Sequence, residues 1–90
     1  MAAELTGTEL VVRVRYFAAA EEAAGCEEEL LGLTPGATLG DLKLVLAERY
    51  GAMMRKVVDS GSFLVGGVVR RDPAFPLGER VDVLPPFAGG

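Results

Sequence analysis

The chain has 90 residues, of which half are apolar and 24 % are charged, and its formal net charge is −4. This length allows one small domain with one hydrophobic core, and the apolar content is that of a globular protein, not of a disordered one. The negative charge argues against a nucleic-acid-binding surface.

Histidine is absent and Cys26 is the only cysteine. The chain therefore lacks the commonest general base and metal ligand, and it cannot build an internal disulfide, a zinc cluster or an iron–sulfur site by itself. We expect a protein that binds no metal and no cofactor of its own, and one that is poorly equipped to catalyse a reaction unaided.

Residues 1–8 are expected to form a flexible lead-in to the domain. They include an acidic residue and have no apolar stretch long enough for a signal peptide. Nothing further along the chain approaches the roughly 18 apolar residues of a membrane span. These features predict a soluble cytoplasmic protein that does not associate with a membrane.

Residues 9–33 predict two antiparallel strands joined by a short helix. The first strand alternates, with Leu10, Val12, Val14 and Tyr16 on one face and Val11, Arg13, Arg15 and Phe17 on the other. Alanines and glutamates at 18–24 favour a helix, which Gly25 is placed to end. The second strand is expected at 27–33, with a Pro-Gly turn after it.

The clearest helix of the sequence begins after Thr38. Thr38 and Asp41 have the spacing of a capping box, and Gly51 is placed to end the helix. The apolar stripe, which we expect to pack in the core, consists of Leu39, Leu42, Leu46 and Tyr50. Leu44 points away from this stripe; of two interpretations, a contact point or simply an exposed leucine, we favour the second. The segment 53–58, rich in methionine and valine, predicts only a short, poorly defined stretch with one further helical turn.

Residues 62–84 predict three more strands. Segments 62–65 and 68–70 flank Gly66-Gly67, a strong hairpin signal, and 80–84 is the closing strand. The closing strand returns after a long excursion that includes the helix, which suits parallel pairing with the first strand. The expected fold class is α+β: a β-grasp (ubiquitin-like) arrangement with a mixed sheet of about five strands and one principal helix.

A single helix can cover only one face of such a sheet. The uncovered face would carry residues such as Val11, Phe17 and Leu84. An exposed face with apolar residues is a natural place for a partner to bind.

The most informative segment is LPPFAGG at 84–90. Pro85 and Pro86 have no N–H, so they end the sheet pairing and hold the chain extended. Gly89 and Gly90 have no Cβ and can be threaded into a narrow slot. We therefore expect a domain over residues 9–84, a protruding tail over 85–90, and a functional group that is the main-chain carboxylate of Gly90.

At this point the chain resembles the small subunit of molybdopterin synthase, a MoaD-like sulfur carrier of the ThiS/MoaD ubiquitin-like superfamily. The resemblance covers nearly the whole chain from Leu10 onward and includes RYFA at 15–18 and PGATLGDL at 35–42. Only LPPFAGG at 84–90 is specific. Two departures are mild: Phe87 stands where a smaller apolar residue is common, and residues 1–8 extend beyond the usual start.

The resemblance implies a function for the tail. An ionised carboxylate is a poor acyl electrophile, so an E1-like adenylating partner would use ATP to activate Gly90, and a sulfurtransferase would supply the sulfur of a thiocarboxylate. The large synthase subunit, in a hetero-oligomer expected to hold two small and two large subunits, would bind cyclic pyranopterin monophosphate and receive the sulfur. In this scheme Gly90 carries the sulfur, and the residues that thread and aim the tail are Gly89, Ala88, Phe87, Pro86 and Pro85.

Other functions are open to a chain of this kind. It could carry sulfur for thiamine or cysteine synthesis, since the tail chemistry is shared. It could be a ubiquitin-like modifier joined through Gly90 to lysines, or an interaction domain with an inert tail. Cys26 is not expected to carry the sulfur, because the carboxylates of Glu27, Glu28 and Glu29 should raise the pKa of its thiol.

Overall fold

The computed structural model describes residues 9–86, which fold into three helices and five strands. In chain order these are β1 (Leu10–Tyr16), α1 (Ala19–Ala24), β2 (Glu28–Leu33), α2 (Leu39–Tyr50), α3 (Ala52–Ser60), β3 (Ser62–Val65), β4 (Val68–Arg70) and β5 (Arg80–Leu84).

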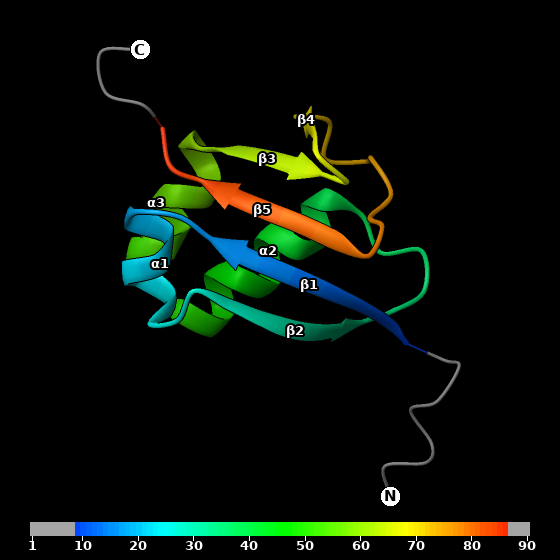
Figure 1. The fold of residues 1–90 in the computed structure, drawn as a ribbon, viewed down its shortest axis with the longest axis horizontal. Coiled ribbons are helices and arrows are strands. Elements are labelled where there is room, and N and C mark those ends of the chain that lie inside the picture. Colours follow the sequence, from blue (N-terminus) through cyan, green and yellow to red (C-terminus); the bar gives the residue numbers. More distant parts are fainter. Residues whose placement is uncertain (1–8, 87–90) are drawn as a thin grey trace, which may run out of the picture.

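The five strands form one mixed sheet in the order β2-β1-β5-β3-β4 (Figure 1). β1 pairs antiparallel with β2 and parallel with β5, as the sequence predicts. β5 also pairs antiparallel with β3, and β3 forms a hairpin with β4 through the predicted Gly66-Gly67 turn. The fold is therefore the predicted α+β β-grasp, and β5 lies in the middle of the sheet.

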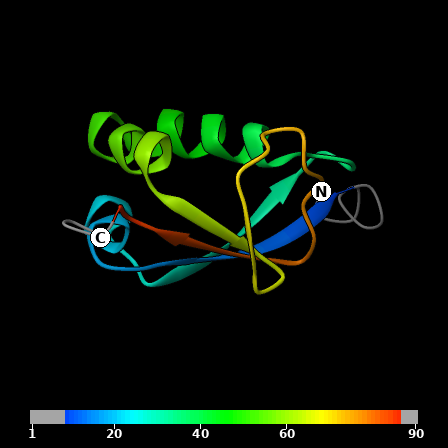
Figure 2. The same ribbon diagram turned by 90° about the horizontal axis from the view of Figure 1, so that it is seen from above.

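The hydrophobic core lies between the sheet and the helices: α2 and α3 cover one face, and α1 lies at one end of the sheet (Figure 2). Strand residues with inward side chains alternate with exposed ones, so Val12, Val14 and Tyr16 are buried while Val11 is 52 % exposed. Leu39, Leu42 and Leu46 of α2 are fully or almost fully buried, as their spacing predicts. Truncating one of these leucines to alanine would cost about 2–5 kcal/mol of stability.

The prediction for residues 53–58, a short stretch with one helical turn, is wrong. Residues 52–60 form a helix of nine residues, not a single turn. Met54, Val57 and Val58 share one buried face at the i, i+3, i+4 spacing, so the segment gains its stability from packing against α1 and α2. Gly51, with φ 90°, ends α2 and begins α3, which allows the chain to change direction between two helices without a loop.

The start of α2 matches its prediction in detail. The Thr38 hydroxyl accepts a hydrogen bond from the Asp41 N–H, and the Asp41 carboxylate accepts one from the Thr38 N–H at 2.9 Å. This reciprocal capping box satisfies two N–H groups that would otherwise lack a partner. Leu44 is 61 % exposed, as its position off the stripe predicts.

The face of the sheet opposite the helices is uncovered (Figure 2). Phe17 and Leu84 are partly exposed near one end of this face, and Val11 and Leu30 are exposed further along. The expectation of an open face with apolar residues is confirmed.

Candidate functional site

The predicted tail follows β5, the central strand of the sheet. Val81 and Val83 of β5 are fully buried, and β5 is held on one side by β1 and on the other by β3. The Phe17 N–H also donates a hydrogen bond to the Val83 carbonyl at 3.1 Å. The last residue of β5, Leu84, therefore leaves the sheet from a fixed position.

Gly61, between α3 and β3, allows a close approach of the chain at this same point. A Cβ built on Gly61 would lie 2.1 Å from the Leu84 carbonyl oxygen and 2.7 Å from the Val57 carbonyl oxygen. Real Cβ atoms do not come so close to backbone oxygens. Only glycine fits here, and its presence lets the end of β5 pack directly against the end of α3.

A shallow, mostly apolar hollow of about 310 Å³ lies beside the end of β5. Its walls come from α1, α3 and the segment after β5, with lining residues Ala19, Met53, Lys56, Val57, Ser60, Pro85 and Pro86. Met53 is 57 % exposed although it is a large apolar side chain. We call this feature the tail-root hollow; it offers a partner an apolar surface where the predicted tail begins.

The sequence-predicted site residues are only partly within the structure. Pro85 is partly buried and Pro86 is exposed, and both follow β5 outside any strand, as predicted. Phe87, Ala88, Gly89 and Gly90 lie outside the described residues. The described part of the site is thus the root from which the tail starts.

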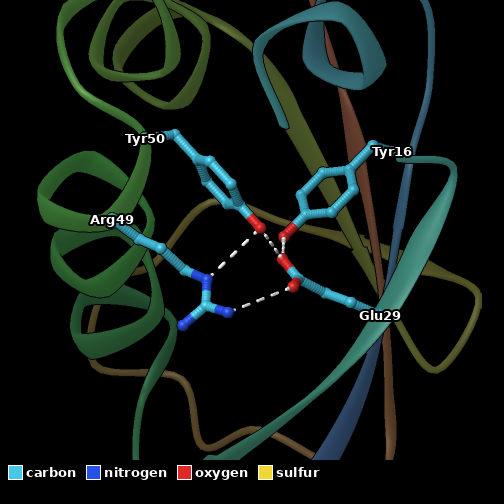
Figure 3. A network of polar contacts seen from close by, with 4 residues as sticks. All are labelled: Tyr16, Glu29, Arg49 and Tyr50. Atoms are coloured by element: carbon cyan, nitrogen blue, oxygen red, sulfur yellow. Dashed lines mark hydrogen bonds and ion pairs between the residues drawn. The ribbon is translucent and has the colours of Figure 1, made fainter. Parts of the chain in front are cut away.

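A polar cluster that the sequence analysis missed ties three elements together (Figure 3). Tyr16 of β1 and Tyr50 of α2 both donate hydrogen bonds to Oε2 of Glu29 on β2. Arg49 lies 3.7 Å from Oε1 of Glu29, and its Nε donates a hydrogen bond to the Tyr50 hydroxyl at 3.3 Å. The two rings meet edge to face, with centroids 6.2 Å apart.

The electrostatics of this cluster keep both phenols protonated. Burial, followed by the hydrogen bond to Glu29, raises the pKa of Tyr16 far above its ordinary value. The same causes, in the same order, raise the pKa of Tyr50. Since both tyrosines act as donors to a carboxylate that is only 16 % exposed, the cluster serves as a clamp between α2 and the sheet.

Cys26 lies near this cluster, and the pKa of its thiol is raised. Burial is the largest cause, and Glu29 and Glu21 add to it, whereas Tyr50 and Arg49 act in the opposite direction. The predicted direction is confirmed, but Glu27 and Glu28 are not among its causes. A thiol with a raised pKa forms less thiolate at neutral pH and is a weaker nucleophile.

Within residues 9–86 no three histidine, cysteine, aspartate or glutamate side chains are placed to hold a metal ion. None of the helices in this described range has the length and apolar character needed to cross a membrane.

The fold of this chain is similar to those of several solved structures. Neither a family model nor a curated protein matches the chain. Among solved structures, a Pyrococcus furiosus protein described as molybdopterin converting factor, subunit 1, superposes with a TM-score of 0.74 at 28 % identity, over 87 % of this chain and 99 % of that one. Small archaeal modifier protein 1 of Methanosarcina acetivorans gives a TM-score of 0.73 at 26 % identity, over 93 % and 100 %.

A Haloferax volcanii protein at 24 % identity, with a TM-score of 0.77 over 92 % of this chain and 89 % of that one, shares the fold. The strand order, the position of α2 and α3 on one face of the sheet and the parallel β1–β5 pair define the chain as a ubiquitin-fold protein. Within that class, its likeness to the converting factor and to the archaeal modifier makes it a MoaD/ThiS-like protein.

Proposed function

We propose that this protein is a sulfur carrier that acts as the small subunit of a molybdopterin synthase, and that the carboxylate of Gly90 is its working group. The observation that carries the proposal is the likeness to the Pyrococcus converting factor subunit over 99 % of that protein's length. The segment LPPFAGG at 84–90, which starts from the centre of the sheet, adds to it.

The proposed reaction uses chemistry that this chain does not supply. An adenylating partner joins the Gly90 carboxylate to the AMP part of ATP and releases pyrophosphate. Hydrosulfide supplied by a sulfurtransferase then attacks the acyl carbon, AMP leaves, and a thiocarboxylate remains. The large synthase subunit would bind cyclic pyranopterin monophosphate, accept this sulfur and provide the acids and bases, in an assembly of two small and two large subunits.

The described root of the tail suits this role. Val81 and Val83 are buried in the core, and the absence of a Cβ at Gly61 lets Leu84 pack closely against the end of α3. Positioned reactions need their atoms within about 3–3.5 Å, so a tail that enters a partner's site benefits from a firm base. The tail-root hollow gives both partners the same apolar surface to recognise.

The test is reconstitution with the adenylating enzyme, ATP and a sulfide donor, followed by mass spectrometry. The full chain should gain the mass of one sulfur in place of one oxygen, and then convert the pterin when the large subunit is added. A chain that lacks Gly90 should do neither, because its terminal carbonyl is about 3.8 Å short of the reacting position. Sulfur transfer by the truncated chain would overturn the thiocarboxylate mechanism.

A second candidate is a ubiquitin-like modifier. The likeness to an archaeal modifier protein at 26 % identity favours it. In that case the adenylated Gly90 would form an isopeptide bond with lysines of other proteins. Tryptic peptides that carry a Gly-Gly remnant on lysine, present with the wild-type chain and absent without Gly90, would identify this function. A sulfur carrier for thiamine or cysteine synthesis would instead be sulfurated without converting the pterin.

A further inference from the structure

β2 is an edge strand whose outer side is open. It is the first strand of the sheet order and pairs only with β1 among the described residues (Figure 1). The Tyr16 N–H donates a hydrogen bond to the Glu27 carbonyl at 2.8 Å. In an antiparallel ladder, hydrogen-bonded and non-hydrogen-bonded residue pairs alternate, so Glu29 and Leu31 also form backbone hydrogen bonds with β1. Leu30 and Gly32 therefore direct their N–H and C=O groups away from β1. An edge of this kind is a template for another strand.

A groove of about 430 Å³ runs along this edge, between β2 and α2. Gly32 and Leu33 form its sheet side, and Leu44 and Val45 form its helix side. It shares no lining residue with the tail-root hollow. The groove is a separate surface, and the tail chemistry gives it no role.

The two most exposed leucines of the described chain flank the β2 edge. Leu30 is 63 % exposed and lies on the open face of the sheet, while Leu44 is 61 % exposed and lies on the helix side. Side chains of an added strand would alternate between these two sides. Leu30 would therefore contact an apolar side chain on one side of that strand, and Leu44 would contact one on the other side.

The charges around the groove are acidic. Asp41 and Glu48 line it, and Glu28 is exposed at the start of β2. Arg13 and Arg15 of β1 lie opposite Leu30 and Glu28 in the sheet, but none of the described residues that line the groove itself is basic. A segment that binds here is complementary if it carries lysine or arginine beside its apolar residues.

We propose that the β2 edge and its groove bind an extended segment of a protein partner by strand addition, and that this segment has alternating apolar residues flanked by basic ones. Main-chain hydrogen bonds to Leu30 and Gly32 supply the pairing, and contacts with Leu30 and Leu44 select the side chains. The proposal is independent of the sulfur chemistry and of the tail.

The experiment uses the full chain and a synthetic peptide in which valine and threonine alternate between pairs of lysines. Amide hydrogen exchange by NMR should show new protection at Leu30 and Gly32 when the peptide is added. The variant Leu44→Ala should weaken peptide binding by about five-fold or more, the loss typical of truncating an important contact. Met53→Ala, which truncates a similarly exposed side chain on α3, should leave the affinity unchanged.

A charge pair of variants tests the choice of a basic segment. Glu48→Lys should weaken binding of the lysine-flanked peptide, and the loss should shrink at high salt, whereas Glu22→Lys on α1 should have no effect. A glutamate-flanked peptide should bind less tightly than the lysine-flanked one.

The proposal would be overturned by unchanged exchange at Leu30 and Gly32, by equal affinities for Leu44→Ala and Met53→Ala, or by tighter binding of the glutamate-flanked peptide. A concentration-dependent dimer that protects the same two amides without peptide would show that a second copy of the chain occupies the edge, and this too would contradict it.

Discussion

Ala18 has a backbone conformation that favours glycine. Its φ of 53° and ψ of −121° are those of the first central residue of a type II′ turn, and the Ala20 N–H donates to the Phe17 carbonyl at 3.0 Å across the turn. It is the one residue other than glycine with positive φ within 9–86. The turn places α1 beside the end of β5, so the strain is stored next to the tail root.

We predict that Ala18→Gly stabilises the protein by about 0.5–2 kcal/mol, since relief of strain exceeds the extra entropy of glycine in the unfolded chain. Ala23→Gly is the matched control, because Ala23 lies inside α1 and the same change there should destabilise by about 0.5–1 kcal/mol. Urea unfolding of both variants gives the comparison. A loss of stability in Ala18→Gly of the size seen in the control would show that the turn is not strained.

Gly61 is a second residue at which one atom decides the local structure. Gly61→Ala forces a Cβ onto the Leu84 and Val57 carbonyl oxygens and should destabilise the protein by about 1–3 kcal/mol, as overpacking does. Gly78→Ala is its control, because a Cβ at Gly78 meets nothing within 4 Å. NMR shifts of Leu84 should move in the first variant and not in the second. Equal free energies of unfolding for Gly61→Ala and Gly78→Ala would mean that the backbone accommodates the Cβ at Gly61 without loss of stability.

At the level of elements, the clamp of Tyr16, Glu29, Arg49 and Tyr50 joins α2, β1 and β2 across the sheet (Figure 3). It has a consequence at high pH. A tyrosine whose pKa is raised by folding contributes its full stabilisation below the unfolded value of about 10 and loses it as the pH rises through the folded value.

We predict that the free energy of unfolding falls as the pH rises above about 10, and that Tyr16→Phe reduces this fall because it removes one of the two titrating donors. The variant should also be less stable at neutral pH by about 1–3 kcal/mol, since Glu29 loses a partner in a partly buried position. Chemical denaturation at several pH values between 8 and 11 measures both effects. An unchanged pH dependence in Tyr16→Phe would contradict the role assigned to the cluster.

The contrast between α2 and α3 shows what the sequence can predict about an element. α2 has a capping box, a long apolar stripe and a glycine at its end, and all three signals are local. α3 begins at a glycine without a side-chain cap and is only nine residues long, so its stability depends on packing against α1 and α2. The clamp cannot be predicted from local sequence signals either, because Glu29 and Tyr50 come together only when the chain folds.

At the level of the whole molecule, strand alternation, turn residues and the long excursion before β5 are enough to predict the β-grasp topology. Only part of the structure at the root of the tail can be predicted from the sequence. Pro85 and Pro86 mark where the sheet ends, but the role of Gly61 and the hollow around Met53 arise from contacts between α3 and the end of β5. The role of Gly90 stays a prediction.

The tail-root hollow and the groove between β2 and α2 should act independently of each other. If the adenylating partner recognises the tail root, Met53→Lys places a charge in the tail-root hollow and should lower kcat/KM for sulfuration at Gly90 by about five-fold or more. Leu44→Lys adds the same charge in the groove beside β2 and should leave sulfuration unchanged. Both side chains are more than half exposed, so neither change should lower the melting temperature appreciably. A similar loss of sulfuration in both variants would mean that the partner's footprint reaches around the helices, and that the tail root is not a separate recognition surface.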